Sequence, residues 1–313
     1  MKKDTLTIGT RSSKLALWQA DYVAERLRQE YPGLVVEERL MTTKGDKILD
    51  APLAKIGGKG LFTKELEQAM LAGEIDLAVH SLKDMPTEVP DGLMITAITE
   101  RYDPGDAFVS NRYASLADLP QGAVIGTSSL RRKAQLLHAR PDLVVKDLRG
   151  NVNTRLKKLD AGEYDAAVLA VAGLKRLGFG ARITEVLPQS MILPAVGQGA
   201  LAIEARTDDQ AVRDLVAFLN DEATVFCAKA ERAFLARVEG GCQVPVGVYA
   251  TPDGDALNVE AVIASLDGKR LYRDSVHGAK TEAEQLGTTL ADKLLDAGGI
   301  DIMHVIGLLL DRE

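Results

Sequence analysis

The chain has 313 residues, a length that predicts two or three domains around separate cores. Hydrophobic residues make up 46% and charged residues 27%, which is typical of a soluble globular protein. The formal net charge of −7 disfavours a general nucleic-acid-binding role. No charged segment followed by an apolar run opens the sequence, so we expect no export signal and a cytoplasmic protein.

Two further absences narrow the class of protein. The longest uncharged stretch, residues 186–203, contains Pro188 and Pro194, so we expect no membrane span. The two cysteines, Cys227 and Cys242, and the four scattered histidines have no zinc-like spacing, so we expect no metal site.

An internal repeat predicts the architecture. Residues 9–13 read GTRSS and 126–129 read GTSS, 32–36 (PGLVV) match 141–145 (PDLVV), and 72–79 (AGEIDLAV) match 161–168 (AGEYDAAV). Each copy reads as a strand, a turn, a helix, a strand, a helix and a strand, which favours two α/β domains with parallel sheets. We expect these domains to flank a cleft, into which the helix N-termini would present N–H groups to an anion.

The first helix of each copy can be placed from its turn. In the first copy Ser12 or Ser13 is the expected N-cap, and Leu15, Trp18, Tyr22 and Val23 define the predicted apolar face. In the second copy Leu130, Ala134 and Leu137 define the corresponding face.

The first copy contains a glycine-rich insertion that we interpret as a lid. It includes Lys55 and Lys59, and Leu61 and Phe62 are expected to anchor its end. The other interpretation is a disordered surface insertion.

The rest of the chain departs from the repeat. Residues 193–203 resemble a hinge followed by a buried strand, residues 222–238 a long helix, 259–263 a strand and 282–297 an amphipathic helix. We therefore expect an N-terminal α/β domain of residues 1–99 with 194–219, a second α/β domain of 100–193 and a C-terminal α+β domain of 220–313.

Basic residues are concentrated in the second copy. Between residues 126 and 176 there are 11 basic and 5 acidic residues, a net charge of +6 against −13 for the rest of the chain. Such a region indicates either a specific anionic ligand or a solvated charged surface. Because no P-loop or dinucleotide fingerprint is complete, carboxylates fit the arginines at least as well as a nucleotide.

Two residues stand out as candidates for chemistry. Cys242 lies in a glycine-rich turn after a helix, which is consistent with a nucleophile, an attachment point or an inert loop thiol. Asp84 follows a predicted strand, where α/β sheets present functional groups, although a simple turn residue is the alternative.

Seven motifs together resemble the porphobilinogen deaminase family. They are TRSS (10–13) with LALWQ (15–19), GKGLF (58–62), HSLKD (80–84), GTSSLRR (126–132), LRGNV (148–152), PAVGQG (194–199) and EGGCQVP (239–245). The order is kept over nearly the whole chain, and the resemblance is weakest after about Tyr249. Lys14 stands where relatives are expected to have proline.

The resemblance implies an enzyme and a cofactor. The family condenses four porphobilinogen molecules head to tail into hydroxymethylbilane and releases four ammonia molecules, on a dipyrromethane that a cysteine thioether holds. It implies two periplasmic-binding-protein-like α/β domains flanking a cleft, a small C-terminal domain and a cytoplasmic monomer without nucleic-acid or membrane partners. The product would pass to the next enzyme of tetrapyrrole, and hence heme, biosynthesis.

The resemblance also assigns the residues. Cys242 would carry one covalent dipyrromethane per chain, and Asp84 would be the catalytic carboxylate. Cofactor carboxylates would bind to Lys83, Ser129, Arg131, Arg132 and Arg155, and the substrate and growing chain to Arg11, Arg149 and Arg176, with Lys55 and Lys59 in the lid. A non-catalytic two-domain anion-binding protein is the first alternative, and a phosphate-ester or nucleotide enzyme is the second.

Overall fold

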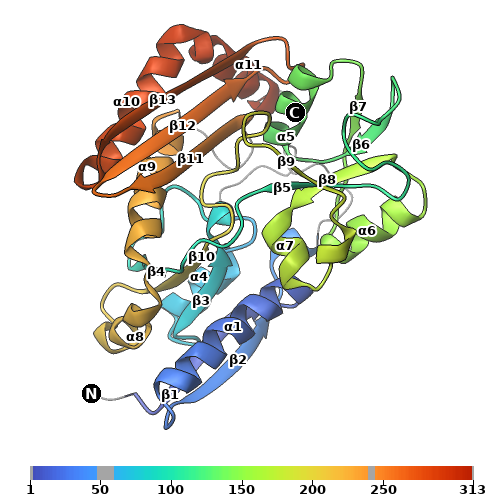
Figure 1. Cartoon of the computed structure of the whole chain (residues 1–313). Helices are drawn as coiled ribbons and strands as arrows, with labels where there is room; N and C mark the ends of the chain where they lie inside the picture. The colour runs from blue at the N-terminus through green and yellow to red at the C-terminus, as the bar shows by residue number, and fades with distance from the viewer. Residues whose placement is uncertain (1–2, 48–59, 239–243, 312–313) are drawn as a thin grey trace. The chain divides into compact units, whose positions relative to one another are not determined.

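The computed structural model describes residues 3–47, 60–238 and 244–311 (Figure 1). It forms two compact units. Of the described residues, the first unit contains 3–47, 60–102 and 200–225, and the second contains 103–199, 226–238 and 244–311. Because residues 103–199 and 226–313 belong to the same unit, the predicted boundaries of three domains remain a prediction.

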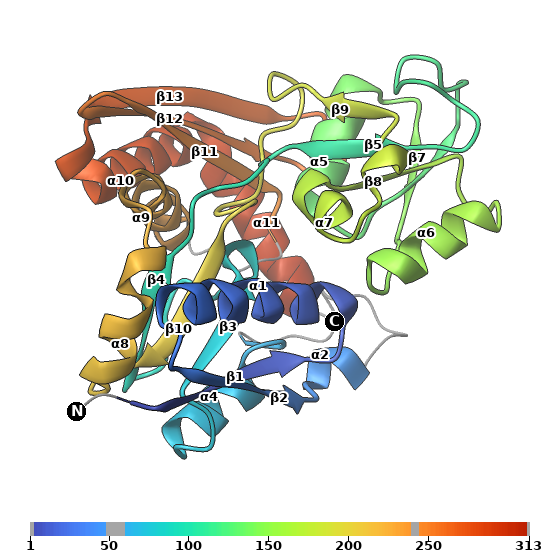
Figure 2. The same cartoon turned by 60° about the horizontal axis from the view of Figure 1, so that its bottom comes forward.

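The first unit contains a five-stranded sheet. Its strands are β1 (Thr5–Arg11), β2 (Val35–Met41), β3 (Leu77–Ser81), β4 (Leu93–Ile98) and β10 (Leu201–Arg206), in the order β2-β1-β3-β10-β4. Its helices are α1 (Lys14–Glu30), α2 (Lys44–Lys47), α4 (Lys64–Leu71), η1 (Leu82–Asp84), α8 (Gln210–Val216) and η3 (Ala217–Leu219). Helix α1 packs on strands β1, β2 and β3 (Figure 2).

The second unit contains a sheet of the same design. Its strands are β5 (Asp106–Val109), β6 (Val124–Gly126), β7 (Val144–Lys146), β8 (Ala166–Ala170) and β9 (Glu185–Leu187), in the order β7-β6-β8-β5-β9. The accompanying helices are α5 (Leu130–Ala139), α6 (Val152–Asp160), α7 (Val171–Arg176) and η2 (Gly180–Arg182). The prediction of two similar α/β parts is therefore confirmed.

The prediction that these sheets are parallel is only partly correct. Strands β1, β2 and β3 are parallel, as are β6, β7 and β8, but β10 runs antiparallel to β3 and β4. Strand β5 likewise runs antiparallel to β8 and β9. Both β10 and β5 lie outside the repeated βαβ segments, so no crossover helix forces them to be parallel.

The C-terminal part is the small α+β domain that the sequence predicts. Strands β11 (Val246–Asp253), β12 (Ala256–Ala264) and β13 (Leu271–Ala279) form an antiparallel sheet. The surrounding helices are α9 (Glu222–Arg237), η4 (Lys280–Glu282), α10 (Ala283–Leu294), η5 (Leu295–Gly299) and α11 (Ile300–Asp311). Phe234, Ile263 and Leu290 lie fully buried in their common core, and Cys227 is buried in the same core, as expected of a structural cysteine.

The repeated sequences perform the same local tasks in both units. Ser13 caps α1 by accepting a hydrogen bond from the Ala16 N–H at 3.3 Å. Ser129 caps α5 in the same way, accepting from the Arg132 N–H at 3.3 Å. These side chains satisfy N–H groups that the first helical turn would otherwise leave unpaired.

The repeated segments 72–79 and 161–168 also form the same local structure in both units. Asp76 accepts a hydrogen bond from the Thr7 N–H, and Asp165 from the Val124 N–H, each at 2.8 Å. Gly73 and Gly162 precede them with φ of 71° and 78°, the left-handed conformation that ends a helix and favours glycine. The repeated sequence therefore determines how the helix ends and how the next strand begins.

The buried face of α1 differs from the predicted one. Val23 is fully buried, but Trp18 and Tyr22 are half-buried and stack on each other with ring centroids 5.4 Å apart. Small residues, Ala20 and Ala24, take the fully buried positions. Tyr22 packs against the same core from a half-buried position.

Candidate functional site

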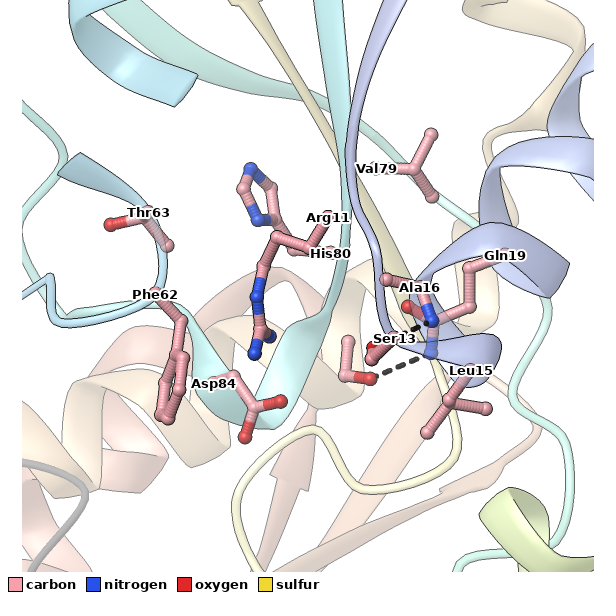
Figure 3. Close-up of a pocket in the computed structure, with 11 residues that line it drawn as sticks. Arg11, Ser13, Leu15, Ala16, Gln19, Phe62, Thr63, Val79, His80 and Asp84 are labelled. Atoms are coloured by element: carbon pink, nitrogen blue, oxygen red, sulfur yellow. Dashed lines mark hydrogen bonds between the residues drawn. The ribbon is translucent and has the colours of Figure 1, made fainter. Parts of the chain in front are cut away.

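A pocket in the first unit lies where strands β1 and β3 end (Figure 3). Its volume is about 60 Å³, more than the roughly 10–15 Å³ that one water requires. Eleven residues line it: Arg11, Ser13, Leu15, Ala16, Gln19, Phe62, Thr63, Val79, His80, Ser81 and Asp84.

Arg11 supplies a cation to this pocket. It is the last residue of β1, and its guanidinium carbon lies 4.3 Å from the centre of the Phe62 ring, a cation–π contact. Phe62 in turn packs on Gly45, where an added Cβ would lie 2.2 Å from the ring. Phe62 therefore lies between Gly45 and the Arg11 guanidinium, and its expected role as an anchor of the insertion stays a prediction.

Asp84 supplies an exposed carboxylate on a fixed backbone. It ends the short helix η1, between the buried side chains of Leu82 and Met85. The Leu82 N–H donates to Ala200 O at 3.0 Å, and the Met85 N–H donates to Leu82 O at 3.1 Å. Figure 3 shows the Asp84 carboxylate and the Arg11 guanidinium pointing into the same space. An acid–base group and an anion-binding group are therefore available together.

Polar groups fix the other walls of the pocket. The Gln19 amide donates a hydrogen bond to Ser81 Oγ at 2.8 Å, tying α1 to the end of β3. His80 Nε2 lies 2.9 Å from Glu204 Oε2, which ties β3 to β10. Lys83, which directly precedes Asp84, is half-buried.

Arg131 and Arg132 form a separate polar centre in the second unit. Arg131 Nη1 donates to Asp106 Oδ2 at 2.6 Å and Arg132 Nε donates to Asp106 Oδ1 at 2.9 Å. Burial alone would raise the pKa of Asp106, but the two guanidiniums hold it well below its usual range. Two buried cations thus share one carboxylate, and the group of three carries a net charge of +1.

Two backbone oxygens hold the arginines, and the Gln198 amide nitrogen holds the carboxylate that they share. Arg131 also donates to Leu193 O at 2.6 Å, Arg132 to Val168 O at 3.2 Å, and the Gln198 amide to Asp106 Oδ1 at 3.1 Å. Burial lowers the pKa of Arg132. Each guanidinium is at most 6% exposed, so its geometry is set before any ligand binds.

The remaining predicted residues of the second unit are half-buried near its strand and helix ends. Arg155 Nε donates to Gly150 O at 2.8 Å, and Arg176 donates to Gly199 O at 2.9 Å. Burial lowers the pKa of Arg149. Ser129 caps α5 at the turn that precedes the arginine pair.

The structure thus brings Arg11 and Asp84 to one pocket, and Arg131 and Arg132 to one carboxylate. Cys242, Lys55 and Lys59 lie outside the described residues.

Sequence reasoning missed Asp106 and Gln198. A carboxylate at the start of the buried stretch 106–109 was the available signal for Asp106. Gln198 lies within the PAVGQG motif, but nothing in that motif indicates its partner.

The described part of the chain was also searched for metal-holding clusters and for membrane-spanning helices. Within residues 3–47, 60–238 and 244–311, no cluster of three or more His, Cys, Asp or Glu side chains is arranged to hold a metal ion. In the same ranges none of the helices has the length and apolar character needed to cross a bilayer.

Known proteins resemble the chain either at low sequence identity, among solved structures, or at high identity over nearly its whole length. A solved putative methionine-binding lipoprotein from Bacillus subtilis is 15% identical with a TM-score of 0.43, over 71% of this chain and 92% of the other. The methionine-binding protein MetQ is 15% identical with a TM-score of 0.46, over 71% and 92%. Porphobilinogen deaminases are much more similar, at 56% identity for Geobacter sulfurreducens and 54% for Geobacter metallireducens, each over 97% of this chain and 95% of the relative.

Family comparison covers most of the sequence. Residues 6–214 match the family described as "Porphobilinogen deaminase, dipyromethane cofactor binding domain", and residues 225–296 match "Porphobilinogen deaminase, C-terminal domain". The chain belongs to the porphobilinogen deaminase family.

Proposed function

We propose that Asp84 is the catalytic carboxylate of the porphobilinogen deaminase reaction and that Arg11 binds a substrate carboxylate beside it. As a member of its family, the protein is a transferase that condenses four porphobilinogen molecules into hydroxymethylbilane and releases four ammonia molecules. The observation that carries the assignment is the shared pocket of Asp84 and Arg11. It offers a proton-accepting oxygen beside a cation suited to the acetate or propionate of a pyrrole.

Asp84 is suited to proton transfer because its carboxylate is exposed while its backbone is fixed. The carboxylate oxygens accept hydrogen bonds from pyrrole N–H groups and stabilise positive charge on a substrate ring. One of these oxygens then takes the proton that a pyrrole carbon loses when two rings join. Arg11 keeps the substrate in register, because Phe62 limits the movement of its guanidinium.

The family's cofactor is dipyrromethane, and the second unit contains groups that fit it. Arg131 and Arg132 have one carboxylate between them and a net charge of +1, so an additional carboxylate would balance this charge. We assign these two residues, with Lys83, Ser129 and Arg155, to the carboxylates of the cofactor. When bound, dipyrromethane supplies the pyrrole carbon to which the first substrate is joined.

We assign Arg149 and Arg176 to the lengthening chain, whose carboxylates increase with each condensation, and Lys55 and Lys59 to a lid. Cys242 is assigned to the thioether. The three predicted domains, a cleft between the first two, a monomeric state, a cytoplasmic location and transfer of the product to the next tetrapyrrole enzyme complete the proposal.

Intact-protein mass spectrometry tests the attachment most directly. The purified protein should be heavier than its sequence by two substrate units less two ammonia molecules, because a thioether survives denaturation. The added mass should map to a peptide that contains Cys242. The change Cys242→Ser should remove this thioether, whereas the control Cys227→Ser, in the buried core, should keep it. Active protein with the bare polypeptide mass would contradict the attachment.

A further inference from the structure

Gln135 is a buried amide on α5 that has no part in the proposed function. It lies one helical turn after Arg131 and is 1% exposed. Its Oε1 accepts a hydrogen bond from the Leu193 N–H at 2.8 Å, and its Nε2 donates to Leu193 O and to Arg131 O, each at 3.3 Å. A side-chain amide has two N–H donors, so both are used. Gln135 therefore holds both backbone polar groups of Leu193, as a neighbouring strand of a sheet would.

The Leu193 carbonyl connects Gln135 to the pair of buried arginines. Leu193 O also accepts a hydrogen bond from Arg131 Nη1 at 2.6 Å. A carbonyl oxygen has two lone pairs, so it can accept both hydrogen bonds at once. The same guanidinium pairs with Asp106, which Arg132 shares. A shift of Leu193 would therefore move Arg131 relative to Asp106 or break one of its contacts.

Strand β11 holds the same backbone from a second side. It is an outer strand of its sheet, and its Val248 N–H donates to Pro194 O at 3.1 Å. At Gly247 an added Cβ would lie 2.9 Å from Leu193 O, so the two backbones approach closely. In the sequence β11 begins four residues after Cys242. This backbone therefore joins helix α5, which carries the arginines, to the strand that follows the cysteine.

We propose that Gln135 is a positioning residue for the cofactor. It holds Leu193 where Arg131 can present its guanidinium to a cofactor carboxylate, at a fixed place relative to the strand after Cys242. This inference rests on the proposed assignment of Arg131 and Arg132 to the cofactor. An apolar side chain in place of Gln135 would leave the buried Leu193 N–H without a partner, and a carboxylate would face two carbonyl oxygens.

Hydrogen exchange tests the contact between Gln135 and Leu193 without any assay of turnover. The Leu193 N–H should exchange slowly in the wild type and about tenfold faster in Gln135→Met, because the thioether is a poor acceptor of similar size. Pro194 has no amide hydrogen, so the signal of Leu193 is not mixed with that of the next residue. Unchanged exchange in Gln135→Met would overturn the proposal.

Cofactor loading tests the positioning role, and intact mass measures it. The fraction of purified protein that carries two substrate units less two ammonia molecules should fall about threefold or more in Gln135→Met. Gln135→Glu should be loaded still less, because its negative charge faces two carbonyl oxygens and partly cancels the charge that attracts the cofactor. Wild-type loading in Gln135→Glu would overturn the proposal. Gln135→Asn keeps an amide that is one methylene too short, and it replaces Gln135→Met if that variant fails to fold.

Leu136→Ala is the matched control. Leu136 lies on the same helix and is fully buried in the core, but its apolar side chain makes no hydrogen bond to Leu193. The variant should lower the thermal midpoint and keep its cofactor loading. Equal losses of loading in Leu136→Ala and Gln135→Met would overturn the positioning role, because loading would then follow stability alone.

Arg131→Leu separates this inference from the proposed function on which it rests. Low loading in both Arg131→Leu and Gln135→Met supports both. Low loading in Arg131→Leu with wild-type loading in Gln135→Met would overturn only the role of Gln135. Wild-type loading in Arg131→Leu would overturn the assignment of this arginine to the cofactor, and with it the positioning role.

Discussion

The turns at residues 9–13 and 126–129 share a sequence and a backbone task, but they lead to different chemistry. Both end in a serine that caps a helix, Ser13 in the first unit and Ser129 in the second. The first turn places Arg11 in a pocket with the exposed Asp84. The second precedes two arginines that are buried against Asp106. The same local frame thus places an exposed carboxylate and a guanidinium in one pocket of the first unit, and two buried guanidiniums against one carboxylate in the second.

The difference follows from where the charged residues stand relative to the turn. Arg11 lies before its helix, at the end of β1, and therefore points into the space beyond the sheet. Arg131 and Arg132 lie in the first turn of α5, on the side that packs against β5 and the loop at Leu193. Buried charges need partners, and Asp106 is the partner that the fold provides.

The largest expected effect concerns the accessible site. The change Asp84→Asn should lower kcat by a factor of about 10²–10⁴, because an amide keeps the size of the side chain but cannot accept the proton. Folding and cofactor attachment should be retained, since the side chain is exposed. Steady-state kinetics and intact mass check this, with the exposed Asp91→Asn as the control. A wild-type rate in Asp84→Asn would remove its catalytic assignment.

A change at the buried centre should affect assembly and stability together. Arg131→Leu or Arg132→Leu should lower the free energy of unfolding by about 3–5 kcal/mol, because Asp106 loses a buried partner. The fraction of protein that carries cofactor should fall more than the rate of later condensations. Denaturant unfolding and intact mass measure the two effects, and Lys133→Leu on the same helix is the control. Full cofactor loading with only slower product release would contradict the assignment.

The smallest effects should come from the two capping serines. Ser13→Ala and Ser129→Ala should each lower the free energy of unfolding by about 0.5–2 kcal/mol, since each removes one N-cap hydrogen bond. Only Ser129→Ala should also reduce cofactor loading, because Ser129 is assigned to a cofactor carboxylate. Equal loading in both variants would restrict Ser129 to its capping role.

Sequence reasoning was most successful where the structure depends on neighbours in the chain. It predicted the duplicated α/β parts, the small C-terminal α+β part and an N-cap at Ser12 or Ser13, of which Ser13 is the one that caps α1. It was wrong about wholly parallel sheets, because β5 and β10 join from outside the repeats. It placed Trp18 and Tyr22 on the apolar face of α1, where both are half-buried and alanines take the fully buried positions.

The sequence alone determined the repeat, the N-cap region of the first helix and the position of Asp84 after a buried strand, since hydrogen bonds within a few residues fix these features. Only the tertiary structure decided which distant charges meet. The pairs Arg131 with Asp106 and His80 with Glu204 join residues 25 and 124 positions apart. Strand order and register bring such residues together, and burial then makes their charges interdependent, because water no longer screens them.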